Sequence, residues 1–232
     1  MPNHITQRLT ITFPTPFDAK AFIHKHVNKE NCLDFQSLIP RPEEYEGSNG
    51  LSGYSESVAL LAAIMGGEGD TRALARALAL TVDEVKDLPP ELLQSYALKV
   101  AFENPMLIRV GLQHRYLLLK YGAGDWYEWS VDNWGTKRDA YSGDQGLSDD
   151  GLTLTLQFDT AWGAPHPILA KIAELYPALT FNYMAFDEGW FFAYYGTDLS
   201  NLTRIKPERD DPKTLELFEK LYGEPPEFGD ES

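Results

Sequence analysis

The stretch from Asp125 to Tyr141 reads Asp-Trp-Tyr-Glu-Trp-Ser-Val-Asp-Asn-Trp-Gly-Thr-Lys-Arg-Asp-Ala-Tyr and carries three of the chain's 5 tryptophans. Asp125 followed three residues later by Glu128 is a capping-box pattern, and Gly135 suits the left-handed residue that ends a helix. The stretch therefore predicts a short helix with aromatic side chains around most of its circumference, which must be covered on several sides. Three tryptophans are accordingly expected to be largely buried, namely Trp126, Trp134 and Trp162.

Length and composition predict a globular protein with a substantial core. The chain has 232 residues, of which 43% are hydrophobic, enough for one large domain or two small ones. Its start lacks the basic and apolar regions of a signal peptide and no run of eighteen apolar residues occurs, so we expect a cytoplasmic protein. Cys32 is the single cysteine, which excludes an intrachain disulfide and a thiolate metal cage within one chain.

The charge is strongly acidic. Asp and Glu number 35 against 20 Lys and Arg, giving a net charge of -15. Such a chain repels phosphate backbones and anionic lipid surfaces at long range, so we expect neither double-stranded DNA nor a membrane as partner. A host protein with a basic or neutral surface fits the charge better. The same charge is also explained by an acidic surface that only keeps the protein soluble.

Working outward from the aromatic helix, the two ends of the chain predict strands and helices in alternation. His4 to Phe13 alternates apolar and polar residues, as a half-buried strand does. The other expected elements are a helix after Thr15, a strand at 35–39 before Pro40, a short strand at 136–141, a Gly/Asp loop at 142–151, a strand at 152–158, a helix after Pro165, and a hairpin of 179–186 with 190–195.

The middle of the chain has helical periodicity. A Gly- and Ser-rich stretch from Tyr45 to Gly53 predicts a mobile loop, and helices are expected at 57–65, 71–80, 81–88, 91–103 and 106–121. The segment from Thr71 to Val85 resembles the first half of a helix-turn-helix, but Ala79 stands in its turn. The second helix of that pair is acidic and short, which argues against reading a major groove.

The order of elements fits an α+β fold: a ferredoxin-like two-layer sandwich, with a mainly antiparallel sheet and helices on one face. An all-helical subdomain is inserted into it. We expect the core at 1–42 and 123–200, the helical insertion at 43–122, and a C-terminal helix with an acidic disordered tail at 201–232.

Several dispersed motifs resemble one known family. They are the opening Met-Pro-Asn-His-Ile-Thr-Gln-Arg-Leu, Phe35 to Ile39 followed by Pro-Arg-Pro-Glu-Glu, Asp125-Trp126-Tyr127 with Asn133-Trp134-Gly135-Thr136-Lys137, and Phe158-Asp159-Thr160-Ala161-Trp162 before Pro165. In these residues the chain is similar to the YubB-like family of phage- and conjugative-plasmid-encoded proteins of unknown function. The resemblance implies a ferredoxin-like domain, which names a shape and not an iron cluster, and it supplies no catalytic residues.

Motifs for catalysis, metals or cofactors are missing from the sequence. No nucleophile elbow, phosphate-binding loop or zinc-binding His-Glu-x-x-His helix occurs, and His24 with His26 point to different faces of a helix. We therefore expect no catalytic residue, no metal and no cofactor. Four acids at strand ends leave two interpretations open, acid/base or cation-binding groups and ordinary turn residues; they are Asp139, Asp159, Asp187 and Glu188.

The residues after the aromatic helix form the candidate site. In a strand at 136–141, Lys137, Asp139 and Tyr141 share one face, so the amine is expected to pair with the carboxylate or to serve a function. The tryptophans could also stack bases, although core packing is the simpler interpretation. The candidate ligand- or partner-binding residues are Trp134, Lys137, Tyr141, Asp159 and Trp162.

These observations favour a non-enzymatic accessory protein of a phage or plasmid that binds a host protein, in a counter-defence role. The alternative is a small-ligand-binding protein or enzyme that uses a cleft between the sheet and the insertion, with Trp134, Lys137 and Tyr141 as its floor.

Overall fold

The structure, a computed structural model, describes residues 3–46 and 54–226. It divides into two compact units. A sheet unit comprises Met1–Arg41 and Ser130–Ser232, and a helical unit comprises Pro42–Trp129. Among the described residues, no helix is long and apolar enough to cross a membrane.

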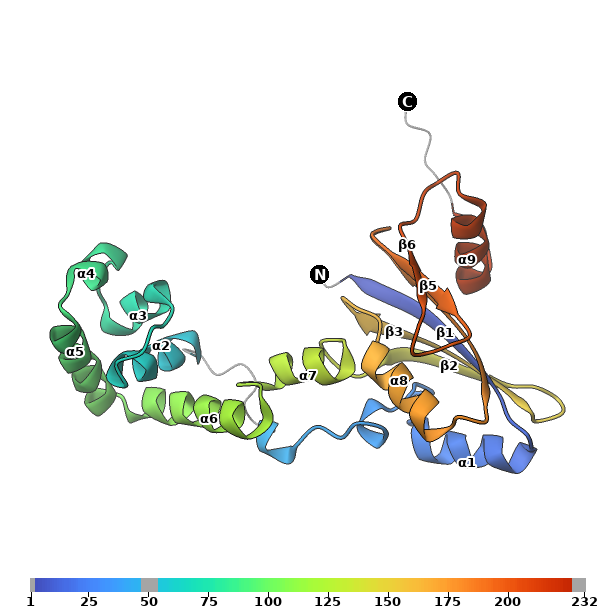
Figure 1. Ribbon diagram of the computed structural model, residues 1–232, viewed down its shortest axis with the longest axis horizontal. Coiled ribbons are helices and arrows are strands. Elements are labelled where there is room, and N and C mark those ends of the chain that lie inside the picture. The colour runs from blue at the N-terminus through green and yellow to red at the C-terminus, as the bar shows by residue number, and fades with distance from the viewer. Residues whose placement is uncertain (1–2, 47–53, 227–232) are drawn as a thin grey trace. The chain divides into compact units, whose positions relative to one another are not determined.

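The sheet unit is built on a six-stranded sheet in the order β2-β3-β1-β4-β5-β6, in which every neighbouring pair is antiparallel. The N-terminal strand therefore lies between two strands that follow the insertion (Figure 1). The strands are β1 (His4–Thr12), β2 (Tyr141–Leu147), β3 (Thr153–Ala161), β4 (Thr180–Asp187), β5 (Ala193–Gly196) and β6 (Thr203–Ile205).

Alternation along β1 determines the two faces of the sheet. Ile5, Leu9 and Ile11 are fully buried, whereas the residues between Ile5 and Ile11 that point the other way are partly exposed. Leu9 pairs with Leu156 of β3 and with Tyr183 of β4, so apolar side chains meet across three strands. The alternation predicted from the sequence is confirmed here.

Helices cover the two faces of the sheet unequally. On the inner face, α1 (Pro16–His26) packs Phe22 against Phe13 with ring centroids 5.5 Å apart, and α8 (His166–Leu175) is buried along Ile168, Leu169 and Ile172. On the outer face, α9 (Pro212–Tyr222) packs Leu217 and Leu221 against β4. The mixed α+β class is confirmed, and α9 adds a third, partial layer to it.

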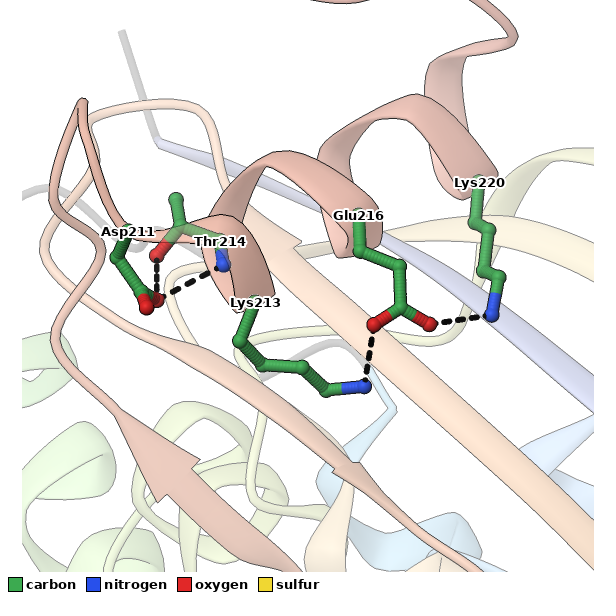
Figure 2. A network of polar contacts seen from close by, with 5 residues as sticks. All are labelled: Asp211, Lys213, Thr214, Glu216 and Lys220. Carbon is green, nitrogen blue, oxygen red and sulfur yellow. Dashed lines mark hydrogen bonds and ion pairs between the residues drawn. The ribbon is translucent and has the colours of Figure 1, made fainter.

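Polar contacts along α9 hold the start and the exposed side of this helix. Asp211 accepts hydrogen bonds from the backbone N–H and the hydroxyl of Thr214, at 2.9 and 2.8 Å. Glu216 lies between Lys213 and Lys220, 2.9 and 2.6 Å from their amines (Figure 2). These amines lower the pKa of Glu216 to about 2. Because the three charged side chains are partly exposed, their pairs mainly order the surface of the helix.

A polar side chain lies in the middle of the sheet core. Gln7 is fully buried on the inner face of β1, and its amide nitrogen donates to Oγ1 of Thr160 at 2.6 Å. Its carbonyl oxygen accepts from the hydroxyl of Tyr183 at 2.6 Å. Thr160 in turn donates to the carbonyl oxygen of Gly163 at 2.6 Å. The hydrogen-bonding groups of the buried amide therefore have partners within the protein.

The helical unit contains the insertion that the helical periodicity predicts. Its core is formed mainly by α2, α3 and α5, with Leu60 fully buried at the centre. Asp70 caps α3, and Thr81 with Glu84 forms the expected capping box at the start of α4. The helices are α2 (Tyr54–Ile64), α3 (Thr71–Leu78), α4 (Val82–Asp87), α5 (Pro90–Glu103), α6 (Pro105–Tyr121) and α7 (Trp126–Trp134), the last containing the boundary between the units.

The first and last segments of the helical unit are joined by Tyr45. This residue lies in the short 3-10 helix η2 (Glu43–Tyr45), is 1% exposed, and donates its hydroxyl to the carbonyl oxygen of Ala123 at 2.8 Å. Its ring also lies 5.6 Å from that of Tyr121 and 6.1 Å from that of Trp129. The prediction of a mobile loop from Tyr45 to Gly53 is therefore wrong for Tyr45, and residues 47–53 lie outside the described residues.

Several sequence expectations are wrong in detail. Residues 35–39 contain the 3-10 helix η1 (Phe35–Ser37) and not a strand, because Asp34 accepts from the N–H groups of Gln36 and Ser37. The expected strand at 136–141 is irregular up to its last residue, and the expected loop at 142–151 contains most of β2, paired with β3. Strand β6 was not expected. The predicted disordered tail falls largely on 227–232, which are outside the described residues.

Candidate functional site

An exposed tryptophan marks the end of β3 in the sheet unit. Trp162 follows Ala161 directly, has φ of 70°, and is 48% exposed. Its backbone N–H donates to the carbonyl oxygen of Asn3 at 3.0 Å, which fixes the turn. A large non-glycine residue in the left-handed region costs about 1–2 kcal/mol. The expectation that Trp162 is buried is therefore wrong, and its backbone lies in the strained left-handed region.

Lys137 lies against that ring. Its Nζ is 4.7 Å from the centroid of Trp162, in cation–π geometry. The expected pair with Asp139 does not form, because Oδ1 of Asp139 accepts the backbone N–H groups of Phe35 and Ala140 at 3.0 and 2.9 Å. Burial raises the pKa of Asp139 to about 6, against these two donors. Lys137 is thus held by an aromatic face and not by a carboxylate.

Tyr141 and Asp159 face each other across β2 and β3. The Tyr141 hydroxyl lies 2.8 Å from Nδ1 of His4, and Asp159 accepts from the hydroxyl of Thr6 at 2.9 Å. Burial raises the pKa of Asp159, whereas the Thr6 hydrogen bond and the nearby His4 oppose that rise. Burial also raises the pKa of Tyr141, and Arg138, whose guanidinium carbon is 4.3 Å from the ring centroid, opposes it.

The N-terminal end of β1 joins these two pairs. His4 pairs with Ala161, the residue before Trp162, and its ring meets the edge of the Tyr141 ring with centroids 5.7 Å apart. On the other side, the backbone N–H of His4 donates to Oε1 of Glu188 at 2.8 Å. We name this group the strand-end patch. Its members are His4, Lys137, Arg138, Tyr141, Asp159 and Trp162.

Three of the four strand-end acids gather around β1, and the fourth does not. Asp187, fully buried, accepts from Nδ2 of Asn3 at 3.2 Å and from the N–H of Phe191 at 3.0 Å, and Glu188 binds the backbone of the same strand. Asp139 is occupied elsewhere by Phe35. No group of three or more His, Cys, Asp or Glu in metal-binding geometry occurs within 3–46 and 54–226.

Trp134 does not belong to the patch. It is 1% exposed, and its indole N–H donates to the carbonyl oxygen of Ile39 at 2.8 Å. Its ring lies 5.9 Å from that of Phe35 and 5.4 Å from the guanidinium carbon of Arg41. The expectation of core packing is confirmed for this tryptophan, and its assignment to the floor of an open site is corrected.

The structure therefore brings four of the five candidate residues together and adds two. Sequence reasoning alone does not single out His4 or place Arg138 in a site. For His4 the available signal is its phase in the alternation of β1, which sets it on the outer face with Thr6. For Arg138 the signal is adjacency to Lys137. The resulting patch contains one indole, one phenol, one imidazole, two cations and one carboxylate.

Comparison with known proteins agrees with the fold of the sheet unit. Residues 134–223 match the family model described as a ferredoxin-like domain in Api92-like protein. This part of the chain is therefore similar to a ferredoxin-like domain. The matched segment is less than half of the 232 residues and includes five of the six members of the strand-end patch.

A search of solved structures also gives a match. It is the crystal structure of the protein Api92 from Yersinia pseudotuberculosis, with 11% sequence identity, a TM-score of 0.40, and coverage of 90% of this chain and 99% of that chain. No curated protein matches the sequence. The ferredoxin-like part of the predicted fold is confirmed by the family model.

Proposed function

We propose that this chain is a non-enzymatic accessory protein of a phage or plasmid, and that it binds a host protein through the strand-end patch. The observation that supports the proposal is the exposed, left-handed Trp162 with Lys137 stacked on its ring. The hydrogen bond from its backbone N–H to Asn3 and the Lys137 amine hold Trp162 in place, with 48% of the residue exposed. A large aromatic ring that is held in a fixed position and remains open to solvent is suited to contact a partner protein.

The composition of the patch supports a protein as the partner. Trp, Tyr and Arg are the residues most enriched among the few that dominate protein–protein affinity. Trp162, Tyr141 and Arg138 all belong to the patch. Lys137 lies over the ring of Trp162, and Arg138 lies over the ring of Tyr141. The Lys137 stack restricts the ring before binding, which lowers the entropy cost of association.

Charge supports the kind of host partner. The whole chain has a net charge of -15, which favours approach of a basic or neutral protein. The patch contains the carboxylate of Asp159 as well as the cations Lys137 and Arg138, so the contact itself offers both signs. The resemblance to the YubB-like family supports the phage or plasmid origin. A cytoplasmic location and a counter-defence role also belong to this proposal.

The test is affinity capture from host lysate with three forms of the full chain. We expect wild type and Phe17→Ala to retain the same host protein and Trp162→Ala to lose it. Phe17→Ala is the matched control, because Phe17 lies on α1 outside the patch and is 78% exposed, so this variant also loses an exposed aromatic ring. The captured protein must then bind purified wild type with an affinity that Trp162→Ala lowers. A captured set that is identical for all three forms refutes the proposal.

A second candidate function is binding of a small apolar ligand. The observation that favours it is a hollow of about 350 Å³ between α1 and the end of α8, lined chiefly by Phe13, Phe22, Leu175 and Tyr176. A ligand specific to the folded state raises the melting temperature. A large stabilisation by a compound from a thermal-shift panel, together with no captured host protein, would favour this candidate over the first.

A further inference from the structure

A groove runs between α2 and α6 in the helical unit. It has a volume of about 360 Å³, and its apolar lining includes Leu61, Met65 and Leu118. Met65 is 53% exposed and Leu118 is 42% exposed, so the apolar walls reach solvent. Gly111 forms part of the floor, where an added Cβ would lie 2.7 Å from the carbonyl oxygen of Ser57. The two helices therefore approach closely, and the floor has no side chain at this point.

The α6 side of the groove is cationic. Arg115 is exposed at its rim, next to His114, whose Nδ1 is hydrogen-bonded to the hydroxyl of Tyr54. Along its whole length α6 has three cations and no acid. Lys120 is paired with Glu44 at 2.6 Å, whereas Arg115 makes no ion pair with any described residue. The facing acid is Glu68, which lines the groove from the segment after α2.

We propose that this groove binds an acidic amphipathic helix of a partner protein. An apolar side chain of that helix enters between Met65 and Leu118, and a carboxylate on its flank receives the guanidinium of Arg115. The unpaired cation on a helix without acids, in a chain of net charge -15, provides the charge complementarity. This is a second docking surface, formed by residues other than the strand-end patch.

Charge also argues against two other occupants. A second copy of this chain would place α6 against α6 about a twofold axis, which brings the cations of both helices together. An anionic lipid surface would attract α6 but repel the acidic chain as a whole, and a concave groove cannot lie flat on it. A narrow acidic helix meets the cations of α6 and little of the remaining surface.

The methionines provide a direct measurement. The chain has 4, of which Met65 lines the groove, Met106 lies at the start of α6 outside it, and Met184 lies in the sheet unit. The full chain is labelled with ¹³C at the methionine methyls. The probe is the winner of a display selection from 18-residue helical peptides that share an apolar stripe and differ in the charge of their flanks.

We expect the selected peptides to be acidic and to shift the Met65 methyl saturably, while the Met184 methyl stays in place. Arg115→Glu should weaken this binding by about tenfold, because attraction becomes repulsion. The matched control is Arg109→Glu, the same charge change on the same helix outside the groove lining, which should weaken it by less than about threefold. Melting temperatures of both variants confirm that they fold.

Four outcomes of the binding measurements overturn the proposal, and a fifth would give the groove another occupant. The four are selection of basic peptides, no peptide that shifts Met65, equal weakening by the two arginine variants, and a Met65 shift with phosphatidylserine vesicles as strong as with peptide. If the chain forms a dimer without peptide, and the Met65 methyl signal shifts when that dimer dissociates on dilution, the groove is assigned to a second copy instead. Trp162→Ala should leave the Met65 titration unchanged, so failure at the groove and failure at the strand-end patch are distinguishable.

Discussion

Nε2 of His26 lies 2.7 Å from the hydroxyl oxygen of Tyr176, while Nδ1 of the same ring lies 2.7 Å from Oγ of Ser37. The Ser37 hydroxyl donates to the carbonyl oxygen of Asp34, so it can only accept from Nδ1–H. Nε2 is then the acceptor for Tyr176, and the fully buried ring is held neutral. Burial lowers the pKa of His26 to about 4, Lys25 adds to this, and Asp34 opposes it.

The pH dependence of stability follows from this ring. Between pH 6.5 and pH 4, His26 is protonated in the unfolded chain but remains neutral in the folded chain. The free energy of unfolding therefore falls as the pH falls. Urea unfolding gives the free energy of unfolding of wild type and of His26→Gln. The advantage of wild type in this free energy should decrease by about 3 kcal/mol from pH 7 to pH 4.

Two features make this comparison specific. His24→Gln removes an exposed histidine from the same helix and should leave the wild-type curve unchanged. Asp139, whose pKa is raised to about 6, changes the free energy of unfolding in the opposite direction. Its contribution lowers stability as the pH rises from about 4 to about 6. Because Asp139 is present in both proteins it cancels from the difference. Parallel curves for wild type and His26→Gln would mean that the ring is not kept neutral.

Tyr183→Phe should destabilise the protein by about 1–3 kcal/mol, since it leaves the buried Oε1 of Gln7 without its donor. Chemical unfolding measures the loss. Tyr96→Phe removes a hydroxyl from a 47% exposed ring in the helical unit and should change the free energy of unfolding by less than about 0.5 kcal/mol. Equal effects of the two substitutions would contradict the buried network.

Gly143→Ala should destabilise the sheet unit by about 1–3 kcal/mol through overpacking. Its Cβ would lie 2.4 Å from Sγ of Cys32 and 2.7 Å from the backbone of Asn31. Adding Cys32→Ala should therefore restore only part of the loss, because the Asn31 contact remains. Gly146→Ala is the control on the same strand, where nothing lies within 4 Å of the added carbon. A Gly143→Ala protein as stable as Gly146→Ala would show that the strand has room.

Trp162→Gly should be more stable than Trp162→Ala by about 1 kcal/mol, because both remove the ring but only glycine adopts φ of 70° without strain. Thermal unfolding of the two variants gives the difference. Thr155, an ordinary position of β3, is the control. There the order of stability is expected to be reversed, so that Thr155→Gly is less stable than Thr155→Ala. If Ala equals or exceeds Gly at position 162, the backbone there is not strained, and the supporting observation for the proposed function is lost.

Local patterns were sufficient for much of the fold. The β1 strand follows from alternation, and α7 follows from Asp125, which accepts from the N–H of Glu128 at 2.8 Å, with Gly135 at φ of 78° after its end. What failed depends on distant partners. β2 has the Gly and Asp content of a loop and is a strand because β3 supplies its hydrogen bonds. At 35–39 a short apolar run fits a strand and a 3-10 helix equally, and the cap by Asp34 decides it.

The candidate site was predictable to the extent that local strand patterns indicate its residues. Tyr141 was named from the strand face that it shares with Lys137, and Asp159 from a strand end, and the sheet register brings these two residues together. The Lys137–Trp162 stack was not predictable, because a left-handed tryptophan contradicts local preference and its cation comes from a different part of the chain.

Tyr45 joins the first and last segments of the helical unit by contacts that lie wholly within that unit. The contacts that bring the two ends of this long segment together therefore come from the segment itself. The strands of the sheet unit do not have to offset the entropy cost of closing it. Pro42–Trp129 thus has the core and the joined ends of an independent folding unit, although its last helix, α7, continues into the sheet unit.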